Sequence, residues 1–119
     1  MDGDRIAAHA LGKPGAWEDQ PWEGDVVAKV GPKIFAFLGP ATVGVKCAAT
    51  REEADEWLAR YPGDATVMPY IGRSGWNVLR LDGEIPDEEL VEAVDASYDM
   101  VVGRLARKDR PVGWVAGAR

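Results

Sequence analysis

The sequence has few of the side chains that enzymes use for covalent or acid–base chemistry. Its 119 residues include one histidine, His9, one cysteine, Cys47, and two serines, Ser74 and Ser97. A nucleophile and base would require His9, expected on the solvated side of a short N-terminal helix, to meet Cys47 or a serine. We therefore expect no catalytic residues and no enzymatic activity.

Metal-binding patterns are equally scarce. His9 and Cys47 have no partners at the spacing of metal ligands, and the carboxylates of residues 52–56 have the pattern of a solvated helix face. A single cysteine cannot form an internal disulfide, which suits a reducing compartment, and we expect Cys47 to be a small core residue. The sequence predicts no metal site and no cofactor.

Long apolar runs are absent as well. No stretch approaches the length of a membrane span, and the first ten residues lack the pattern of a signal peptide. We therefore expect a cytoplasmic protein without a membrane partner. The length suits one domain, which we place at residues 1–108, with a loose C-terminal tail at residues 109–119.

The patterns that are present predict an α+β fold. Hydrophobic periodicity and turn residues predict helices at 4–11, 50–61 and 86–107, and strands at 26–30, 33–38, 43–49, 66–70 and 76–81. Residues 17–24 read as a connector or an edge strand. The turns within each strand group are too short for parallel crossovers. We expect two layers: an antiparallel sheet of about five strands, with helices packed on one face.

The helix at 50–61 has the clearest start signal. Thr50 and Glu53 have the spacing of a capping box, in which each side chain bonds the other's backbone N–H. Helical spacing places Trp57 towards the core and Arg51 towards solvent. We therefore expect removal of the Arg51 side chain to cost little stability.

Alternation along the strands places three cations on one face of the sheet. Lys29, Lys46 and Arg80 each lie between apolar neighbours, so all three are expected to be exposed on the face opposite the helices, together with Trp76. The strand at 33–38 is ambiguous. Phe35 and Phe37 have the same parity as Lys33, so either face of this strand fits the buried side.

Several segments in this order and spacing resemble the MmcQ/YjbR-like family. They are PGAWEDQPW, KIFAF, GVKC before a capped helix, RYPG, GWNVLRLDG and SYDMVVGRLARK, and they span roughly residues 11–108. The resemblance implies a CyaY-like fold and a double-wing DNA-binding motif. Departures are Ala48-Ala49 in place of the usual acidic and proline pair, a short N-terminal helix and an extra tail.

The charge distribution agrees with a nucleic-acid role. Segments 26–50 and 65–81 contain five basic and no acidic residues, whereas the remainder contains nine basic and twenty acidic residues. A basic sheet with wing-like hairpins predicts weak, largely non-sequence-specific binding of double-stranded DNA. The candidate nucleic-acid-binding residues are Lys29, Lys33, Lys46, Arg73, Trp76 and Arg80, with Phe35 as an alternative apolar contact.

Two other interpretations stay open. Charged side chains on exposed strands also prevent edge-to-edge aggregation, which needs only a few lysines. The open sheet face would equally suit a protein-interaction adaptor that accepts an acidic or extended polypeptide segment and has no nucleic-acid role. The sequence does not fix the oligomeric state.

Overall fold

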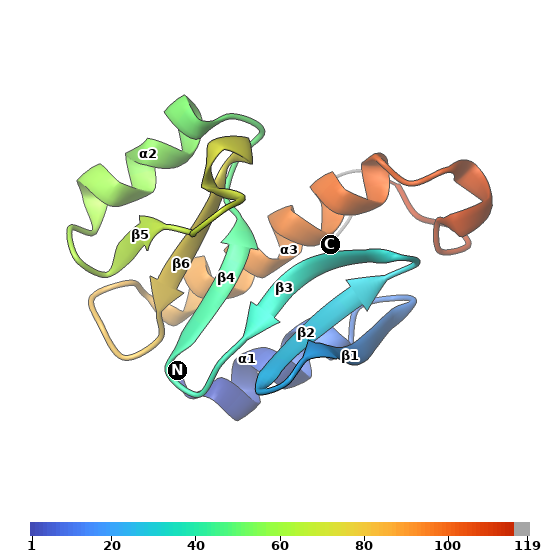
Figure 1. The fold of residues 1–119 in the computed structure, drawn as a ribbon, viewed down its shortest axis with the longest axis horizontal. Helices are drawn as coiled ribbons and strands as arrows, with labels where there is room; N and C mark the ends of the chain where they lie inside the picture. The colour runs from blue at the N-terminus through green and yellow to red at the C-terminus, as the bar shows by residue number, and fades with distance from the viewer. Residues whose placement is uncertain (116–119) are drawn as a thin grey trace.

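The computed structural model describes residues 1–115 and consists of one antiparallel sheet with helices behind it (Figure 1). The strand order is β1-β2-β3-β4-β6-β5. The strands are β1 (Ala16–Trp22), β2 (Asp25–Val30), β3 (Lys33–Leu38), β4 (Thr42–Lys46), β5 (Ala65–Val67) and β6 (Trp76–Arg80). This confirms the predicted α+β class. The strand beyond the expected five is β1, an edge strand in the segment predicted as connector or edge.

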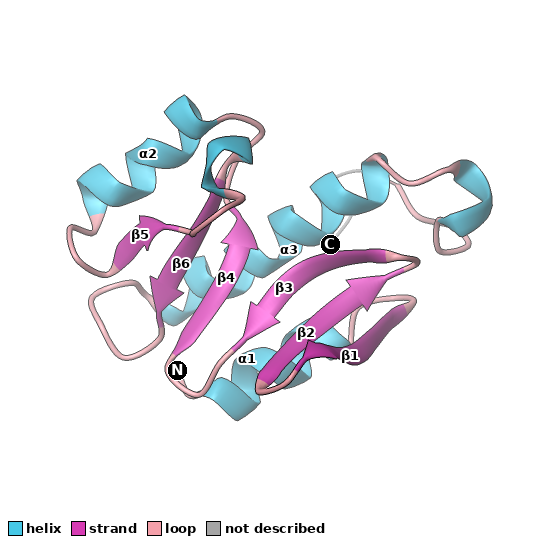
Figure 2. Cartoon of the chain, in the orientation of Figure 1, coloured by secondary structure: helices cyan, strands magenta, loops and turns pink. Residues whose placement is uncertain are grey.

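Three α-helices and two short 3-10 helices make up the other regular elements of residues 1–115 (Figure 2). They are α1 (Gly3–Leu11), α2 (Arg51–Arg60), η1 (Gly72–Ser74), α3 (Asp87–Gly103) and η2 (Arg107–Asp109). Helix α3 lies across β3 and β4 and forms most of the core with them. It ends four residues earlier than predicted, because Arg104 and Leu105 donate to carbonyls three residues back and Ala106 is extended. None of the helices in residues 1–115 is both long and apolar enough to cross a bilayer.

A bulge in β3 resolves the ambiguity of the two phenylalanines. Ala28 of β2 pairs with Ala36, but the next residue, Lys29, pairs with Ile34, so one residue of β3 has no partner. An extra residue reverses the alternation of side chains. Phe35 therefore packs against Tyr98 of α3, with ring centroids 5.2 Å apart, whereas Phe37 faces the other side of the sheet. Phe35 is fully buried and is not available as a DNA contact.

The predicted N-cap of α2 at Thr50 is confirmed, although the Glu53 side chain accepts from the Thr50 hydroxyl rather than from its backbone N–H, and the predicted exposure of Arg51 is wrong. Thr50 Oγ1 accepts the Glu53 N–H at 3.2 Å. The Arg51 guanidinium turns back towards the sheet, where Nη1 donates to the carbonyl oxygens of Gly72 (2.8 Å) and Trp76 (3.0 Å). Arg51 thus joins α2, η1 and β6 through backbone carbonyls that helical periodicity does not reveal.

His9 was predicted to be a solvated helix residue, and its side chain is 33% exposed but is also bonded within the protein. Its Nε2 lies 2.8 Å from Asp95 Oδ1 on α3, and Lys13 Nζ donates to the same oxygen at 2.9 Å. Burial by itself would raise the pKa of Asp95, but the hydrogen bonds from Lys13 and His9 outweigh it and lower the pKa. The cluster ties α1 to α3 on the covered side of the sheet.

Part of the segment predicted as a tail contacts α3. Trp114 Nε1 donates to Asp99 Oδ1 at 3.2 Å, and the Arg110 guanidinium lies over the Trp114 ring at 5.5 Å. Arg110 also donates to the carbonyl oxygen of Gly103 at 2.9 Å. Residues 116–119 of the predicted tail lie outside the described residues.

Candidate binding surfaces on the open sheet face

The sheet face opposite the helices, here called the open face, carries the predicted basic residues. On this face, neighbouring residues of β4 and β6 lie opposite each other: Lys46 pairs with Trp76, and Thr42 pairs with Arg80. The prediction that Lys29, Lys46 and Arg80 point to one side of the sheet agrees with this register. Their surroundings, however, differ from one another.

Two of these cations are already paired within the protein. Lys29 Nζ lies 3.0 Å from Asp19 Oδ2 on β1 and 5.0 Å from the centre of the Trp17 ring. The hydrogen bond from Lys29 is the main cause that lowers the pKa of Asp19. Arg80 lies 3.2 Å from Asp82 at the other end of the sheet from Lys46. Neither residue extends a continuous positive surface, since an acidic side chain accompanies each.

Lys46 was expected to be exposed, and this is wrong, because only 4 % of its surface is accessible. Its aliphatic stem lies at the strand end among apolar neighbours, and Nζ donates to the carbonyl oxygen of Ser74. Burial lowers the pKa of Lys46, and the nearby Arg104 lowers it further. Strand alternation gave the correct side of the sheet but not the depth of the side chain.

A pocket of about 320 Å³ opens beside Lys46, and we call it the basic pocket. Its cations come from three elements: Lys33 from β3, Lys46 from β4 and Arg104 from the end of α3. None of the described residues that line it is acidic. The full lining is Lys33, Ile34, Lys46, Ser74, Trp76, Val101 and Arg104.

The predicted site residues are therefore only partly brought together. Lys33, Lys46 and Trp76 share the basic pocket, and Arg73 is the chain neighbour of Ser74, which lines it. Arg104 also lines the basic pocket, although it was not among the predicted site residues. Within residues 1–115, Lys33, Arg73 and Arg104 form no ion pair.

The centre of the open face is apolar rather than basic. A second and larger hollow of about 670 Å³, here called the apolar groove, runs between the β1–β2 turn and the loop before β6. Trp22 is 54 % exposed on one rim, and Tyr70 is fully exposed on the other. Its full lining is Trp22, Asp25, Phe37, Met68, Pro69, Tyr70, Ile71 and Val78.

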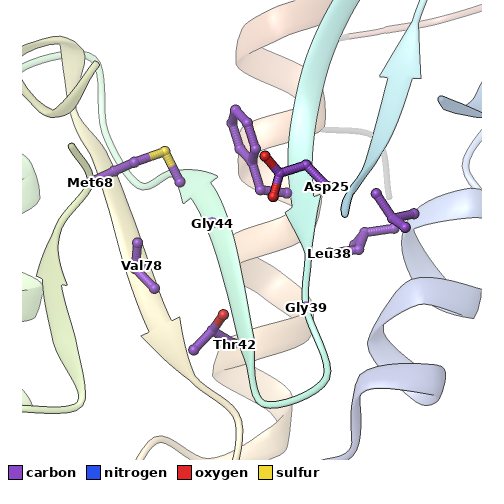
Figure 3. Close-up of a pocket in the computed structure, with 9 residues that line it drawn as sticks. Asp25, Leu38, Gly39, Thr42, Gly44, Met68 and Val78 are labelled. Atoms are coloured by element: carbon purple, nitrogen blue, oxygen red, sulfur yellow. The ribbon is translucent and has the colours of Figure 1, made fainter. Parts of the chain in front are cut away.

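Gly44 of β4 gives this part of the sheet its depth. A Cβ at this position would lie 2.0 Å from Met68 Cε, so a larger residue here would displace the end of the Met68 side chain. Figure 3 shows Met68 and Val78 on one side of Gly44 and Asp25 on the other, around a smaller adjoining pocket of about 130 Å³. Phe37 lines both hollows. Its ring centroid is also 5.8 Å from that of Trp76, so the apolar groove borders the basic pocket.

Of the groups that could support catalysis, Ser74 lines the basic pocket, whereas His9 is bonded to Asp95 on the covered side of the sheet. Cys47 follows β4, and burial raises the pKa of its thiol to about 11, so the thiol is protonated at neutral pH. Within the described part of the chain, no three histidine, cysteine, aspartate or glutamate side chains are placed to hold a metal ion.

Comparison with known proteins agrees with the resemblance in the sequence. The model of the YjbR family matches residues 11–100. The chain is 28% identical to the protein YjbR of Escherichia coli K12 over 111 residues, which cover 88% of this chain and 91% of YjbR. The protein of the same name from Escherichia coli O157:H7 has the same identity and coverage.

Two crystal structures share the fold. A Deinococcus radiodurans protein described by the domain family DUF419 is 21% identical, with a TM-score of 0.80 over 100% of this chain and 96% of its own. A Pseudomonas syringae protein is 14% identical, with a TM-score of 0.68 over 84% of this chain and 98% of its own. With a family model that spans three quarters of the sequence and a fold shared along the whole chain, this protein belongs to the YjbR family.

Proposed function

We propose that this protein is a non-enzymatic, cytoplasmic binding module whose open sheet face accepts a segment of a partner polypeptide. The observation that carries the proposal is the apolar groove, which leaves Trp22, Tyr70 and Ile71 exposed although the same chain buries a complete core on the other face. Contiguous apolar surface that stays open to water is typical of sites for partner binding.

The extent of the groove favours a polypeptide. It reaches from the β1–β2 turn to the loop after β5, and neighbouring strands lie about 4.8 Å apart, so it spans roughly 19 Å across the sheet. An extended chain rises about 3.3 Å per residue, so roughly six residues would cross it. Among the described residues that line it, Asp25 alone is charged, which favours an apolar segment with a neighbouring lysine or arginine over an acidic segment.

The test is retention of partners by immobilised protein after nuclease treatment of a lysate. Ile71→Asp places a charge in the groove at an exposed loop position, where it should not affect folding. The matched control is Val112→Asp, at a fully exposed valine outside the groove. We expect the control to retain the same polypeptides as the unmodified protein, and Ile71→Asp to lose them. Equal retention by both variants, or loss of the polypeptides on nuclease treatment, would contradict the proposal.

Binding of double-stranded DNA is the second candidate, and one observation favours it. Lys33, Arg73 and Arg104 are exposed at the same end of the molecule and have no acidic partner within residues 1–115. Few phosphate contacts are available there, so binding would be weak and would fall steeply with salt. These three residues differ from the predicted DNA-binding residues, which included Lys29 and Arg80, because Lys29 and Arg80 form ion pairs with aspartates of the protein.

A titration of duplex DNA at about 50 mM salt tests this candidate, because phosphate contacts are strongest at low salt. Replacement of Lys33, Arg73 and Arg104 by glutamate should abolish binding. A matched triple replacement of Lys29, Arg5 and Arg60 should weaken it much less, because each already has an acidic partner. Absence of binding by the unmodified protein at this salt concentration would end the DNA hypothesis.

A further inference from the structure

The basic pocket holds positive charge that the described protein does not balance. Lys33, Lys46 and Arg104 line it, and no acidic residue does. An ammonium group has three N–H donors, and Lys46 Nζ uses one of them, on the carbonyl oxygen of Ser74. Two donors of a nearly buried cation therefore have no protein acceptor among residues 1–115.

Such an arrangement disfavours the charged form of Lys46, and an anion beside the cations would relieve this effect. Removing a cation from water and placing a second cation beside it both disfavour the charged form. Both effects act on Lys46, whose pKa is lowered first by burial and then by Arg104. An anion in the pocket would supply acceptors for the remaining N–H groups and offset the repulsion between the two cations.

The shape of the pocket restricts the kind of anion. The cations come from β3, β4 and the end of α3 and line one hollow of about 320 Å³. A duplex backbone presents its phosphates in a row along a convex surface, which suits cations spread along an exposed ridge. The other walls are the side chains of Ile34, Trp76 and Val101, which offer a surface for an apolar or planar group.

We propose that the basic pocket binds a small phosphorylated ligand, with its phosphate group on Lys33, Lys46 and Arg104 and an apolar or planar part against Trp76. Ser74 also lines the pocket, and its hydroxyl group would offer a further donor to the phosphate. The proposal does not depend on polypeptide binding, because the apolar groove and the basic pocket have no lining residue in common.

Calorimetric titration of the full chain with adenosine monophosphate, in a buffer free of phosphate and sulfate, tests the proposal. We expect saturable binding at one site in the micromolar to millimolar range. Inorganic pyrophosphate should compete, and adenosine, which lacks the phosphate, should bind at least about tenfold more weakly. If adenosine binds as well as the nucleotide, the phosphate is not recognised and the proposal is wrong.

Two substitutions locate the site. Arg104→Gln changes an exposed residue and should leave the fold intact, while Lys46→Met keeps the stem and removes the charge. Each should weaken nucleotide binding about tenfold or more. The control is Arg80→Gln at the other end of the sheet, which should leave the affinity within about twofold. Unchanged binding by both Arg104→Gln and Lys46→Met would overturn the proposal.

A parallel titration with duplex DNA separates the two sources of phosphate. Binding of the mononucleotide that depends on Lys46 and Arg104 supports the small ligand. Binding of duplex DNA with the same dependence, without binding of mononucleotide or pyrophosphate, would overturn the proposal and favour the DNA candidate. No binding of any of these probes at millimolar concentration would also overturn it.

Discussion

At the scale of single residues, burial governs the chemistry of the two side chains at the end of β4. The Cys47 thiol is kept from water and has a pKa of about 11, while Lys46 beside it is a cation with little accessible surface. The expectation that Cys47 is a small inner residue agrees with its position against the core. The pattern of apolar and charged residues could not reveal how deep Lys46 lies, because depth depends on Val101 and Arg104, far away in the sequence.

Cys47 should react slowly with thiol reagents in the folded protein. The thiolate is the reactive form, and a pKa of about 11 leaves very little of it at pH 8. The rate of alkylation by iodoacetamide, followed by mass spectrometry, should therefore keep rising with pH towards about 11 in the native protein. In denaturant the midpoint of this pH dependence should fall towards about 8.5, the pKa of a free cysteine thiol. A native midpoint as low as the denatured one would show that the thiol is exposed.

Lys46→Met should not reduce the free energy of unfolding, and we expect a gain of about 1 kcal/mol at neutral pH in the absence of anions. The substitution keeps the buried stem and removes the charge that burial disfavours. The folded-state pKa of Lys46 lies below its unfolded value, so the lysine destabilises the fold below that pKa, and the penalty disappears as pH rises through it towards the unfolded value.

Urea unfolding at pH 7 and at pH 10 checks this prediction. The stability of the unmodified protein should rise relative to that of Lys46→Met between the two pH values. If Lys46→Met is markedly less stable at pH 7, the ammonium group stabilises the fold through its bond to Ser74, and the penalty assigned to its burial is wrong.

At the scale of elements, hydrogen bonds between distant segments hold α1 and α2 in place. Periodicity predicted the three helices and most strands, because it follows directly from which side chains face the core. It could not predict the bulge at Phe35, which depends on the pairing of two strands, or the partners of Arg51 and His9, which lie far away in the sequence. The bulge decides that Phe37 and not Phe35 lies in the apolar groove, and the hydrogen bonds of Arg51 keep this cation from being available to a ligand.

Arg51→Ala should lower the free energy of unfolding by about 2–4 kcal/mol, contrary to the expectation from helical spacing alone. The substitution leaves the carbonyl oxygens of Gly72 and Trp76 and the Asn77 side chain without their donor. The control is Glu52→Ala, at an exposed position of the same helix turn, which should change stability by no more than about 0.5 kcal/mol. Equal urea midpoints for the two variants would contradict the role assigned to Arg51.

Asp95→Asn should weaken the contact between α1 and α3. It should also make the free energy of unfolding depend less on pH under acidic conditions. The folded-state pKa of Asp95 is lower than its ordinary value, so its contribution is complete above the unfolded pKa of about 3.9 and is lost as pH falls through the folded value. The unmodified protein should therefore lose more stability than Asp95→Asn between pH 5 and pH 2. Glu88→Gln, at an exposed position of α3, should follow the unmodified protein. A parallel pH dependence for Asp95→Asn would show that the cluster does not carry this linkage.

At the scale of the whole molecule, the sheet separates a covered face from an open one, and the open face is divided between two kinds of surface. Charge counting along the sequence showed that segments 26–50 and 65–81 contain basic but no acidic residues, whereas the remainder of the chain is acidic. It could not show that Asp19 neutralises Lys29, that Asp82 neutralises Arg80, or that apolar side chains fill the centre of the face. The open face therefore suits a polypeptide partner better than DNA.

The most direct test of polypeptide binding is photo-crosslinking in cells from Tyr70, the fully exposed residue on the rim of the apolar groove. A benzophenone amino acid would replace Tyr70 in one variant and the equally exposed Val112 in a control, with the products identified by mass spectrometry. We expect defined polypeptide adducts from position 70 that Ile71→Asp abolishes and that position 112 does not form. Adducts that are the same from both positions, or that consist of nucleic acid, would contradict it.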